Sequence, residues 1–414
     1  MKAFGIFVTA AAMMVAGTAC DKLNDDPKNN PYKAVTLTTK STDFVRQGNE
    51  FAMEFIDRIY AEEEGDFILS PLSMQFLLGM ILDGAQGQTA DEICSVLGYG
   101  KGEVEAVNEY CLSMLQQLPS LDKKTQLTIA NAIFVNNMYS LLDSYKSTVG
   151  QYYQAEVASL DFSDGPGSLK TINGWCSKQT RGMIPEVLDE VSTDMLAYLF
   201  NAMYFKSQWA EKFPKSNTSE ETFTAEDRSQ RKVPMMKNQA HFAYQENDDF
   251  RMVRLPYGNR AFQMLVILPQ EGKVLSDVIA AMKTPVWEET LCQMVSCNVN
   301  LWLPKFETKY SKKLNEILSE MGMPSAFSAI EANFKAMSPN ALCLSFVKQD
   351  AVIKVDEEGT EAAVVSSAGM MATSAGPEDY VVFHADHPFL YLITEASTGA
   401  ILFAGKYGGS VDGK

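Results

Sequence analysis

The sequence contains few of the residues from which metal and redox sites are usually built. Only three of its 414 residues are histidines, and none of these lies near a cysteine. The seven cysteines form no CxxC pair, so neither a zinc site nor a thioredoxin-like redox motif is expected. The cysteines beyond the N-terminal region lie in apolar surroundings, which is typical of buried free thiols. Cys292 and Cys297 could still form a disulfide in an exported protein.

Basic runs and the signature motifs of enzymes are absent as well. The formal net charge is −17, which argues against nucleic acid or anionic lipid as the main partner. The sequence has no GxSxG, P-loop, HExxH or GxGxxG motif, and no cofactor is expected. His384, Asp386 and His387 could contribute to a Ser-His-Asp site. A histidine in an HPF motif at the start of an apolar strand is more typical of a structural residue, so an enzyme is not expected.

Apolar residues are abundant enough for a large core. Hydrophobic residues make up 46% of the chain and charged residues 21%, as in ordinary globular proteins. No fixed-period repeat and no internal linker rich in Pro, Gly or Ser divides the sequence. Helical patterns prevail in the first part of the chain and strand patterns after residue 223. The sequence therefore predicts one large α+β domain.

The N-terminal region has the pattern of an export signal. Lys2 precedes an apolar run over residues 3–16, which is too short to span a membrane comfortably, and small residues then lead to Cys20. We predict a signal peptide over residues 1–19, a lipidated Cys20 and an acidic tether over residues 20–42. The folded domain then comprises residues 43–414. The expected product is an outer-membrane lipoprotein facing the periplasm or the cell surface, with a plain secreted protein as the alternative.

Periodicity and capping signals place the main elements. Ser70 and Pro71 are suited to begin a helix that is apolar on nearly every side, and Thr89 with Glu92 forms a capping box for the next helix. The other expected helices cover residues 43–62, 102–118, 142–153, 169–180 and 310–321. The expected strands cover residues 67–69, 127–135, 195–205, 233–236, 241–244, 252–256, 262–268, 299–303, 342–355, 381–383, 389–394 and 400–406. The strand over residues 195–205 is almost wholly apolar, which indicates burial on both faces.

The stretch over residues 356–380 fits neither a helix nor a fixed strand. A loop of this length in a compact domain is usually functional or disordered. Its composition is nevertheless that of a strand without a partner. In an extended chain its even-numbered residues share one face and could slide beneath a covering helix. All of these side chains are small or β-branched except the last: Thr360, Ala362, Val364, Ser366, Ala368 and Met370.

Several segments, in order, resemble the serpin family. The resemblance covers residues 44–406 and rests on Ser70–Ser73, on Asn201–Lys206 followed by Trp209 and Phe213, on Leu303–Phe306, on Glu357–Ala363, on Ala385–Phe389 and on Ile401–Lys406. It implies a large central mixed β-sheet, further β-sheets, about nine helices and an exposed reactive loop over about residues 357–380. It also implies a suicide-substrate inhibitor that acts as a monomer. The partners implied are serine proteases, held in a covalent one-to-one complex, with cysteine proteases as a second class.

Family spacing assigns roles within the loop. The hinge comprises Glu357, Glu358, Gly359, Thr360, Glu361, Ala362 and Ala363. The reactive bond falls at Thr373–Ser374, with Ala372, Met371 and Met370 as alternative positions. No Lys or Arg occurs between residues 356 and 380, so trypsin-like targets are not expected. Residues such as Thr, Ala or Met suit a small apolar pocket, which favours elastase-like proteases, followed by subtilisin-like or chymotrypsin-like ones.

The resemblance also assigns residues beneath the central sheet. Ser70, Ser73, Asn201 and Gln349 are expected to form the shutter over which the sheet opens. Serpins often have a histidine where this chain has Gln349, so a polar group is kept and a titratable one is lost. Glu357 and Lys305 are expected to pair at the top of the sheet. The alternative function is that of a non-inhibitory serpin, a carrier or chaperone, but such members tend to have bulky, charged or proline residues in the hinge.

Overall fold

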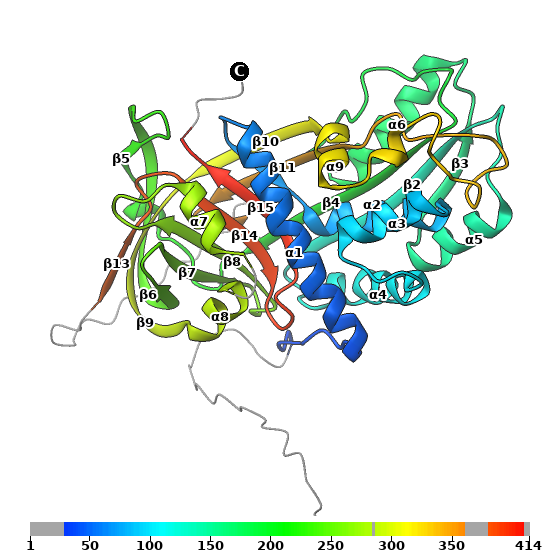
Figure 1. Cartoon of the computed structure of the whole chain (residues 1–414). Helices are drawn as coiled ribbons and strands as arrows, with labels where there is room; N and C mark the ends of the chain where they lie inside the picture. Colours follow the sequence, from blue (N-terminus) through cyan, green and yellow to red (C-terminus); the bar gives the residue numbers. More distant parts are fainter. Residues whose placement is uncertain (1–28, 284–285, 361–379, 410–414) are drawn as a thin grey trace, which may run out of the picture.

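The structure is a computed structural model that describes residues 29–283, 286–360 and 380–409. It confirms the predicted α+β class: helices lie on both faces of one sheet, and a second, larger sheet packs beside it (Figure 1). The described helices are α1 (Thr39–Glu62), α2 (Pro71–Gly84), α3 (Gln88–Leu97), α4 (Val104–Gln117), α5 (Asp143–Tyr152), α6 (Gly165–Gln179), α7 (Leu275–Ala281), α8 (Val286–Gln293) and α9 (Asn315–Met321). Among these helices none is long and apolar enough to cross a membrane.

The smaller sheet positions the site. Its six strands follow the order β10 (Phe306–Lys313), β11 (Lys348–Asp356), β12 (Gly359–Thr360), β4 (Ala197–Gln208), β2 (Gln126–Asn136) and β3 (Glu156–Leu160). The strand β12, only two residues long, is antiparallel to both of its neighbours, β11 and β4. The chain therefore leaves β11, turns and re-enters the same sheet at once.

The larger sheet closes the core behind the first one. Its described strands are β1 (Phe67–Leu69), β15 (Ile401–Tyr407), β14 (Phe389–Glu395), β8 (Phe262–Pro269), β7 (Phe250–Tyr257), β6 (Gln230–Glu246), β9 (Val295–Pro304) and β13 (Val381–His384), in that order, with β5 (Ser219–Thr224) paired to β6. The strands β8, β14 and β15 are buried along their whole length. Such continuous apolar strands need cover on both faces, which helices and the smaller sheet provide.

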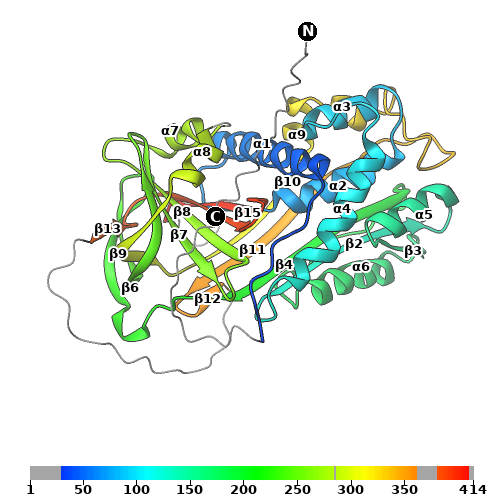
Figure 2. The same cartoon turned by 90° about the horizontal axis from the view of Figure 1, so that it is seen from below.

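Two separate cores lie against the two faces of the smaller sheet. On one face, α6 packs on β2 and β4 and encloses a cluster that includes Trp175, Tyr198 and Phe200. On the other face, α2 packs on β4 and belongs to the main core with Met203 and Phe205 (Figure 2). Because side chains alternate along a strand, the odd-numbered residues of β4 face α2 and the even-numbered ones face α6.

The buried helix α2 begins as predicted. The Ser70 side chain accepts a hydrogen bond from the backbone N–H of Ser73, and Pro71 occupies the first helical position. All but one of the residues of α2 are buried, as expected for a helix that is apolar on nearly every side.

Several predicted elements are wrong or incomplete. The helix α3 begins at Gln88 without a side-chain cap, and Thr89 instead bonds to the Ser325 hydroxyl and accepts from Asn333 N–H. The helix predicted over residues 310–321 begins only at Asn315, because the alternating residues before it complete strand β10 at the edge of the sheet. The strand predicted from residue 342 begins at Lys348. The two strands predicted over residues 233–244 form one strand, β6, and the short elements β3, β5, α7 and α8 were not predicted.

The boundary of the folded part also differs from the prediction. Helix α1 begins at Thr39 rather than after residue 42, and residues 29–38 lie along the body of the molecule. Val35 is buried, its N–H donates to Ser397 Oγ, and the Asn30 side chain bonds to Asp122 at 2.6 Å. The largely polar sequence of this segment gave no sign of these contacts, because its partners lie far away in the sequence.

Candidate functional site

The hinge strand β12 is held tightly between its neighbours. Gly359 lies opposite Gln208 and Asp356, and Thr360 lies opposite Ser207 and Val355. The φ of Gly359 is +157°, and a Cβ at this position would lie 2.0 Å from the carbonyl oxygen of Ser207. Only glycine fits such a close backbone approach.

Thr360 is the first residue of the loop that points into the core. Its side chain is 2% exposed, and its hydroxyl lies 2.6 Å from the hydroxyl of Tyr257. Burial raises the pKa of Tyr257 far above its usual value, so the phenol stays neutral in this contact. Trp209 stacks on Tyr257 at 4.4 Å and donates from its indole N–H to the carbonyl of Asp356. Aromatic packing and backbone contacts thus fix the point at which the loop enters the sheet.

Charged pairs hold the turn that precedes β12. Glu357 lies 3.0 Å from Lys305, as predicted, and also accepts from the Thr218 hydroxyl at 2.9 Å. Burial alone would raise the pKa of Glu357, but hydrogen bonds from its own backbone N–H, Lys305 and Thr218 outweigh it and hold the pKa below its usual value. The Glu358 carboxylate lies 2.8 Å from Lys212, whose hydrogen bond lowers the pKa of that carboxyl.

Below β12 the smaller sheet is open. Within the described part of the chain, β4 and β11 are joined only through the two residues of β12. Three cavities follow one another down this gap. The upper and middle cavities are small, about 20 and 40 Å³, whereas the lower one is about 270 Å³. The predicted burial of β4 on both faces is therefore incomplete: Ala197, Leu199 and Asn201 are only partly buried beside the gap.

The four predicted shutter residues meet beside the middle cavity. The side-chain amide of Gln349 donates to the Ser70 carbonyl at 2.9 Å and accepts from the Ser70 N–H at 3.2 Å. The Ser73 hydroxyl donates to Asn201, and Ser70 Oγ donates to the Leu402 carbonyl at 2.8 Å. Their joint position is consistent with a shutter, although that role stays a prediction.

Asn131 belongs to the same hydrogen-bond network and was not predicted. Its side-chain oxygen accepts from Asn201 at 2.7 Å, and its amide donates to the carbonyl of Tyr153 at 2.7 Å. An asparagine in the middle of the apolar stretch LTIANAIFV is the signal that could have identified it, because a buried polar side chain requires partners.

The comparison with known proteins agrees with this geometry. A family model described as serpin (serine protease inhibitor) matches residues 46–408. The chain belongs to the serpin family.

The relatives of this serpin span archaea and vertebrates. A serpin-like protein of Thermococcus kodakarensis is 32% identical over 99% of both chains. The leukocyte elastase inhibitor of Xenopus laevis is 33% identical over 83% of this chain and 93% of its own. The native crystal structure of the thermophilic serpin tengpin matches with a TM-score of 0.82 and 27% identity, over 92% of this chain and 97% of its own.

The remaining predicted site residues lie outside the described residues. These are Cys20 and, in the loop, Glu361, Ala362, Ala363, Met370, Met371, Ala372, Thr373 and Ser374. In this serpin the side chain of Thr360, the last described residue before these positions, faces the main core.

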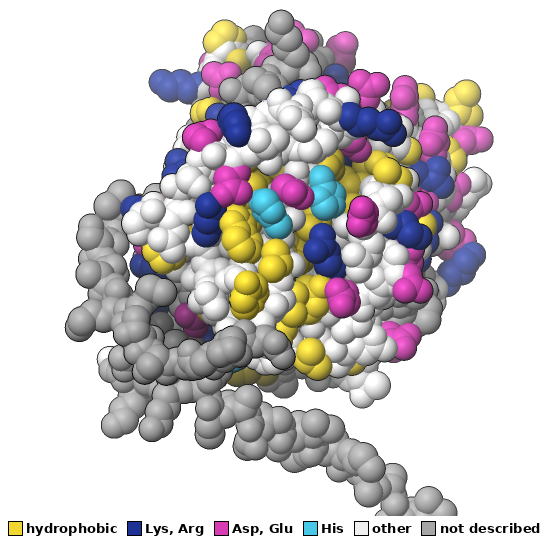
Figure 3. All heavy atoms as spheres, turned by 90° about the vertical axis from the view of Figure 1, so that its left-hand side faces the viewer, with side chains coloured by type: hydrophobic (Ala, Val, Ile, Leu, Met, Phe, Trp, Pro, Cys, Tyr) yellow, Lys and Arg dark blue, Asp and Glu magenta, His cyan; other side chains and the backbone are white. Residues whose placement is uncertain are grey.

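The histidines considered for catalysis lie far from the gap. Histidine, acidic and hydrophobic side chains gather on the face that includes β13 (Figure 3). His387 uses both ring nitrogens, one toward Asp386 at 2.8 Å and the other toward the Pro269 carbonyl at 3.2 Å. A ring engaged in this way has no nitrogen left to activate a hydroxyl. The six cysteines that the structure describes, Cys292 and Cys297 included, are free, and no described cluster of three His, Cys, Asp or Glu could hold a metal.

Proposed function

We propose that this serpin is a suicide-substrate inhibitor of serine proteases and acts by inserting its cleaved loop between β4 and β11. The observation that carries the proposal is the two-residue strand β12, which already occupies the top of the gap and is the one described strand between β4 and β11. Residues C-terminal to Thr360 need only continue the same antiparallel pairing. The sheet can then gain a full central strand.

The chemical step belongs to the protease. Its serine Oγ attacks the carbonyl carbon of Thr373, the C–N bond to Ser374 breaks, and the amine of Ser374 leaves with a proton from the protease histidine. The acyl-enzyme then holds the protease on Thr373. Insertion of the released segment carries the protease away and distorts its oxyanion hole, so hydrolysis of the ester stalls.

The length of the segment suits the gap. The 13 steps from residue 360 to residue 373 extend over about 43 Å as a strand at roughly 3.3 Å per residue. The same number of steps along β4 leads from Ser207 back to Asp194, just beyond the N-terminal end of that strand. Cleavage at Thr373–Ser374 therefore releases a segment about as long as the opening.

Insertion of the strand is clearly favourable in free energy only if the sheet of the uncut protein is strained. About a dozen new backbone hydrogen bonds contribute roughly 1 kcal/mol each. Ordering about a dozen residues costs roughly 1–2 kcal/mol each. The open gap between β4 and β11, with partly buried residues along it, is the feature that insertion would relieve.

Target preference follows from the loop composition. The loop has no Lys or Arg between residues 356 and 380, and Thr373 is small, so we infer elastase-like targets, with subtilisin-like or chymotrypsin-like proteases next. One relative carries the name leukocyte elastase inhibitor. Export with a lipid on Cys20 remains part of the proposal, because a displayed inhibitor meets proteases outside the cell; mass spectrometry of the purified native N-terminus tests it.

The experiment mixes the protein with elastase, chymotrypsin, subtilisin and trypsin. We expect a one-to-one adduct with elastase that survives a denaturing gel, and a released fragment that begins at Ser374. The matched variant Thr373→Arg should shift adduct formation to trypsin, because its pocket carboxylate pairs with the new cation. Turnover of the loop without any adduct would refute inhibition and favour a carrier or chaperone.

A further inference from the structure

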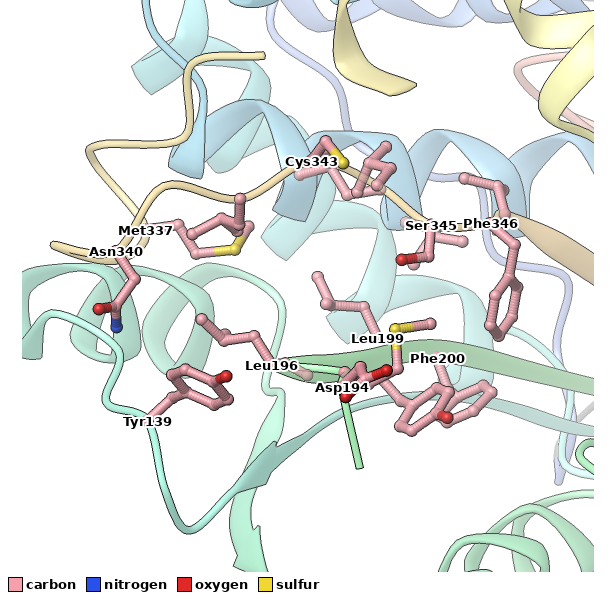
Figure 4. A pocket seen from close by; sticks show the side chains of 18 of the residues that line it. Tyr139, Asp194, Leu196, Leu199, Phe200, Met337, Asn340, Cys343, Ser345 and Phe346 are labelled. Atoms are coloured by element: carbon pink, nitrogen blue, oxygen red, sulfur yellow. The ribbon is translucent and has the colours of Figure 1, made fainter. Parts of the chain in front are cut away.

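The lowest part of the gap between β4 and β11 contains a cavity with largely apolar walls. It measures about 270 Å³, well above the roughly 150 Å³ that holds benzene in an engineered apolar cavity. Its walls include Leu77 and Ile81 of α2, Leu199 of β4, and Leu344 in the segment before β11 (Figure 4). A cavity of this size has room for a fused two-ring aromatic molecule with a short side chain.

The wall that precedes β11 is held in place by hydrogen bonds from outside the cavity. The N–H of Leu344 donates to the Ala326 carbonyl at 2.8 Å. The side chain of Asn315 donates to the Ser345 carbonyl at 2.8 Å and accepts from the Val347 N–H at 2.9 Å. The cavity is therefore preformed, as is usual for sites that bind small molecules.

The charged residues of the lining favour a cationic ligand. Among the described residues that line the cavity only Asp194 and Lys348 are charged. The Lys348 ammonium already donates to the Val187 carbonyl at 3.0 Å and pairs with Asp350 at 2.9 Å. Asp194 is exposed, and no basic side chain in the described part of the chain pairs with its carboxylate. The cavity thus offers one unpaired negative charge, which attracts a cation and repels an anion.

Asn136 fixes the backbone that carries this carboxylate. It is buried, and its side-chain amide donates to the carbonyls of Thr193 and Met195, which flank Asp194, both at 3.1 Å. The N–H of Tyr139 donates to the Asn136 carbonyl at 2.9 Å, and Tyr139 also lines the cavity. A carboxylate and an aromatic ring are two groups that proteins use to bind an ammonium ion.

We propose that this cavity binds a small aromatic amine. The ring system of the amine fills the apolar space between α2 and the segment before β11, and its ammonium group lies at Asp194 and Tyr139. The inference does not rest on the proposed loop insertion, because every residue that carries it belongs to the described part of the uncut protein. A bound amine should raise the melting temperature of the uncut protein, since it binds only the folded state.

Cys343 allows the occupation of the cavity to be measured. It lines the cavity across from Tyr139 and Asp194, and its thiol is free (Figure 4). The uncut protein is treated with N-ethylmaleimide, and alkylation of each cysteine is followed by peptide mass spectrometry. Naphthylethylamine should slow alkylation of Cys343 at least about fivefold, with half-maximal protection below about 1 mM. The exposed Cys292 of α8 is the internal control and should react at an unchanged rate.

Two further probes of similar size separate shape from charge. Naphthylethanol is uncharged and naphthylacetate is an anion. The alcohol should require about two to five times the concentration of the amine for half-maximal protection, and the anion still more. Asp194→Asn should remove the advantage of the amine and leave the alcohol unchanged. The matched variant Glu186→Gln, which removes an exposed charge outside the lining, should change neither.

The variant Leu344→Trp tests the location of the site, because the larger ring fills the cavity. It should abolish protection of Cys343 by the amine, and thermal unfolding verifies that the variant is folded. Absence of protection by the amine at several times 1 mM in wild type would refute the site. Equal protection by the amine and the anion, or an unchanged amine midpoint in Asp194→Asn, would refute the role of the carboxylate. Full protection in folded Leu344→Trp would place the amine elsewhere. Adduct formation with elastase tests the proposed function separately from all of these results.

Discussion

Replacing Thr360 with arginine would test the hinge directly. The threonine side chain is 2% exposed and bonds to the buried hydroxyl of Tyr257 at 2.6 Å. An arginine at this position must either bury its guanidinium among Tyr257, Ile353 and Phe205 or leave the sheet. In the uncut protein it can leave, because β12 is only two residues long. In the inserted state it cannot, because the residues that follow would hold it in place.

The expected effect is large enough to convert the protein from an inhibitor of the protease into a substrate. An unpaired buried charge costs about 3–5 kcal/mol. If most of this cost is present in the transition state for insertion, insertion slows by at least about 100-fold, since each 1.36 kcal/mol is a factor of ten. Hydrolysis of the acyl-enzyme does not involve Thr360 and keeps its rate. The acyl-enzyme should then be hydrolysed before the strand has entered the sheet.

The assay is the ratio of covalent adduct to cleaved protein on a denaturing gel at equal protease concentration. Wild type should give mainly adduct and Thr360→Arg mainly cleaved protein with active protease. Thr360→Ser keeps the hydroxyl for Tyr257 and should remain an inhibitor. An arginine variant that forms as much adduct as wild type would show that Thr360 does not lead the inserted strand, and the mechanism proposed above would be wrong.

Three further predictions concern stability. Burial raises the pKa of Asp83 to about 6, so ionisation of its carboxyl group destabilises the fold as the pH rises from 4 to 7. Urea unfolding should therefore show Asp83→Asn to be more stable than wild type at pH 7, by on the order of 3 kcal/mol, but not at pH 4. Gln349→Leu should cost about 1–3 kcal/mol in the same assay, because the buried N–H of Ser70 loses its acceptor, and an unchanged midpoint would contradict this. The lowered pKa of Glu357 contributes stability above about pH 4.5, and this contribution is lost on acidification. Glu357→Gln should therefore lose less unfolding free energy than wild type when the pH is lowered, and Lys305→Ala should show a smaller change in the same direction.

The local features of the site could be predicted from the sequence because they depend on neighbours in the chain. Ser70 and Pro71 begin α2 by capping and by a fixed φ, and the apolar residues after them require a buried helix. The capping box predicted at Thr89 also rested on neighbouring residues, and this prediction was wrong. The Thr89 hydroxyl instead forms hydrogen bonds with the Ser325 hydroxyl and the Asn333 N–H. Tertiary partners compete with local ones wherever a polar side chain is buried.

The helix predicted from residue 310 shows that tertiary contacts override local sequence signals in strands as well. The residues of β10 carry several lysines, so their sequence suits a helix surface as well as an exposed edge strand. Pairing with β11, at least 35 residues later in the chain, decides in favour of a strand. An edge strand pairs with one neighbouring strand only, and its own sequence is a weak indicator of that pairing.

The sequence alone determined the class of the fold, the buried helix, the family and a loop made of small side chains without a cation. These properties follow from periodicity, composition and motifs that lie close together in the chain. The tertiary structure alone decided that Gln349 meets Ser70, 279 positions away, that β12 has already entered the sheet, and that cavities lie along the gap between β4 and β11. The reason is physical: the register between strands that are not neighbours in sequence, and the space left between them, depend on the packing of the whole core.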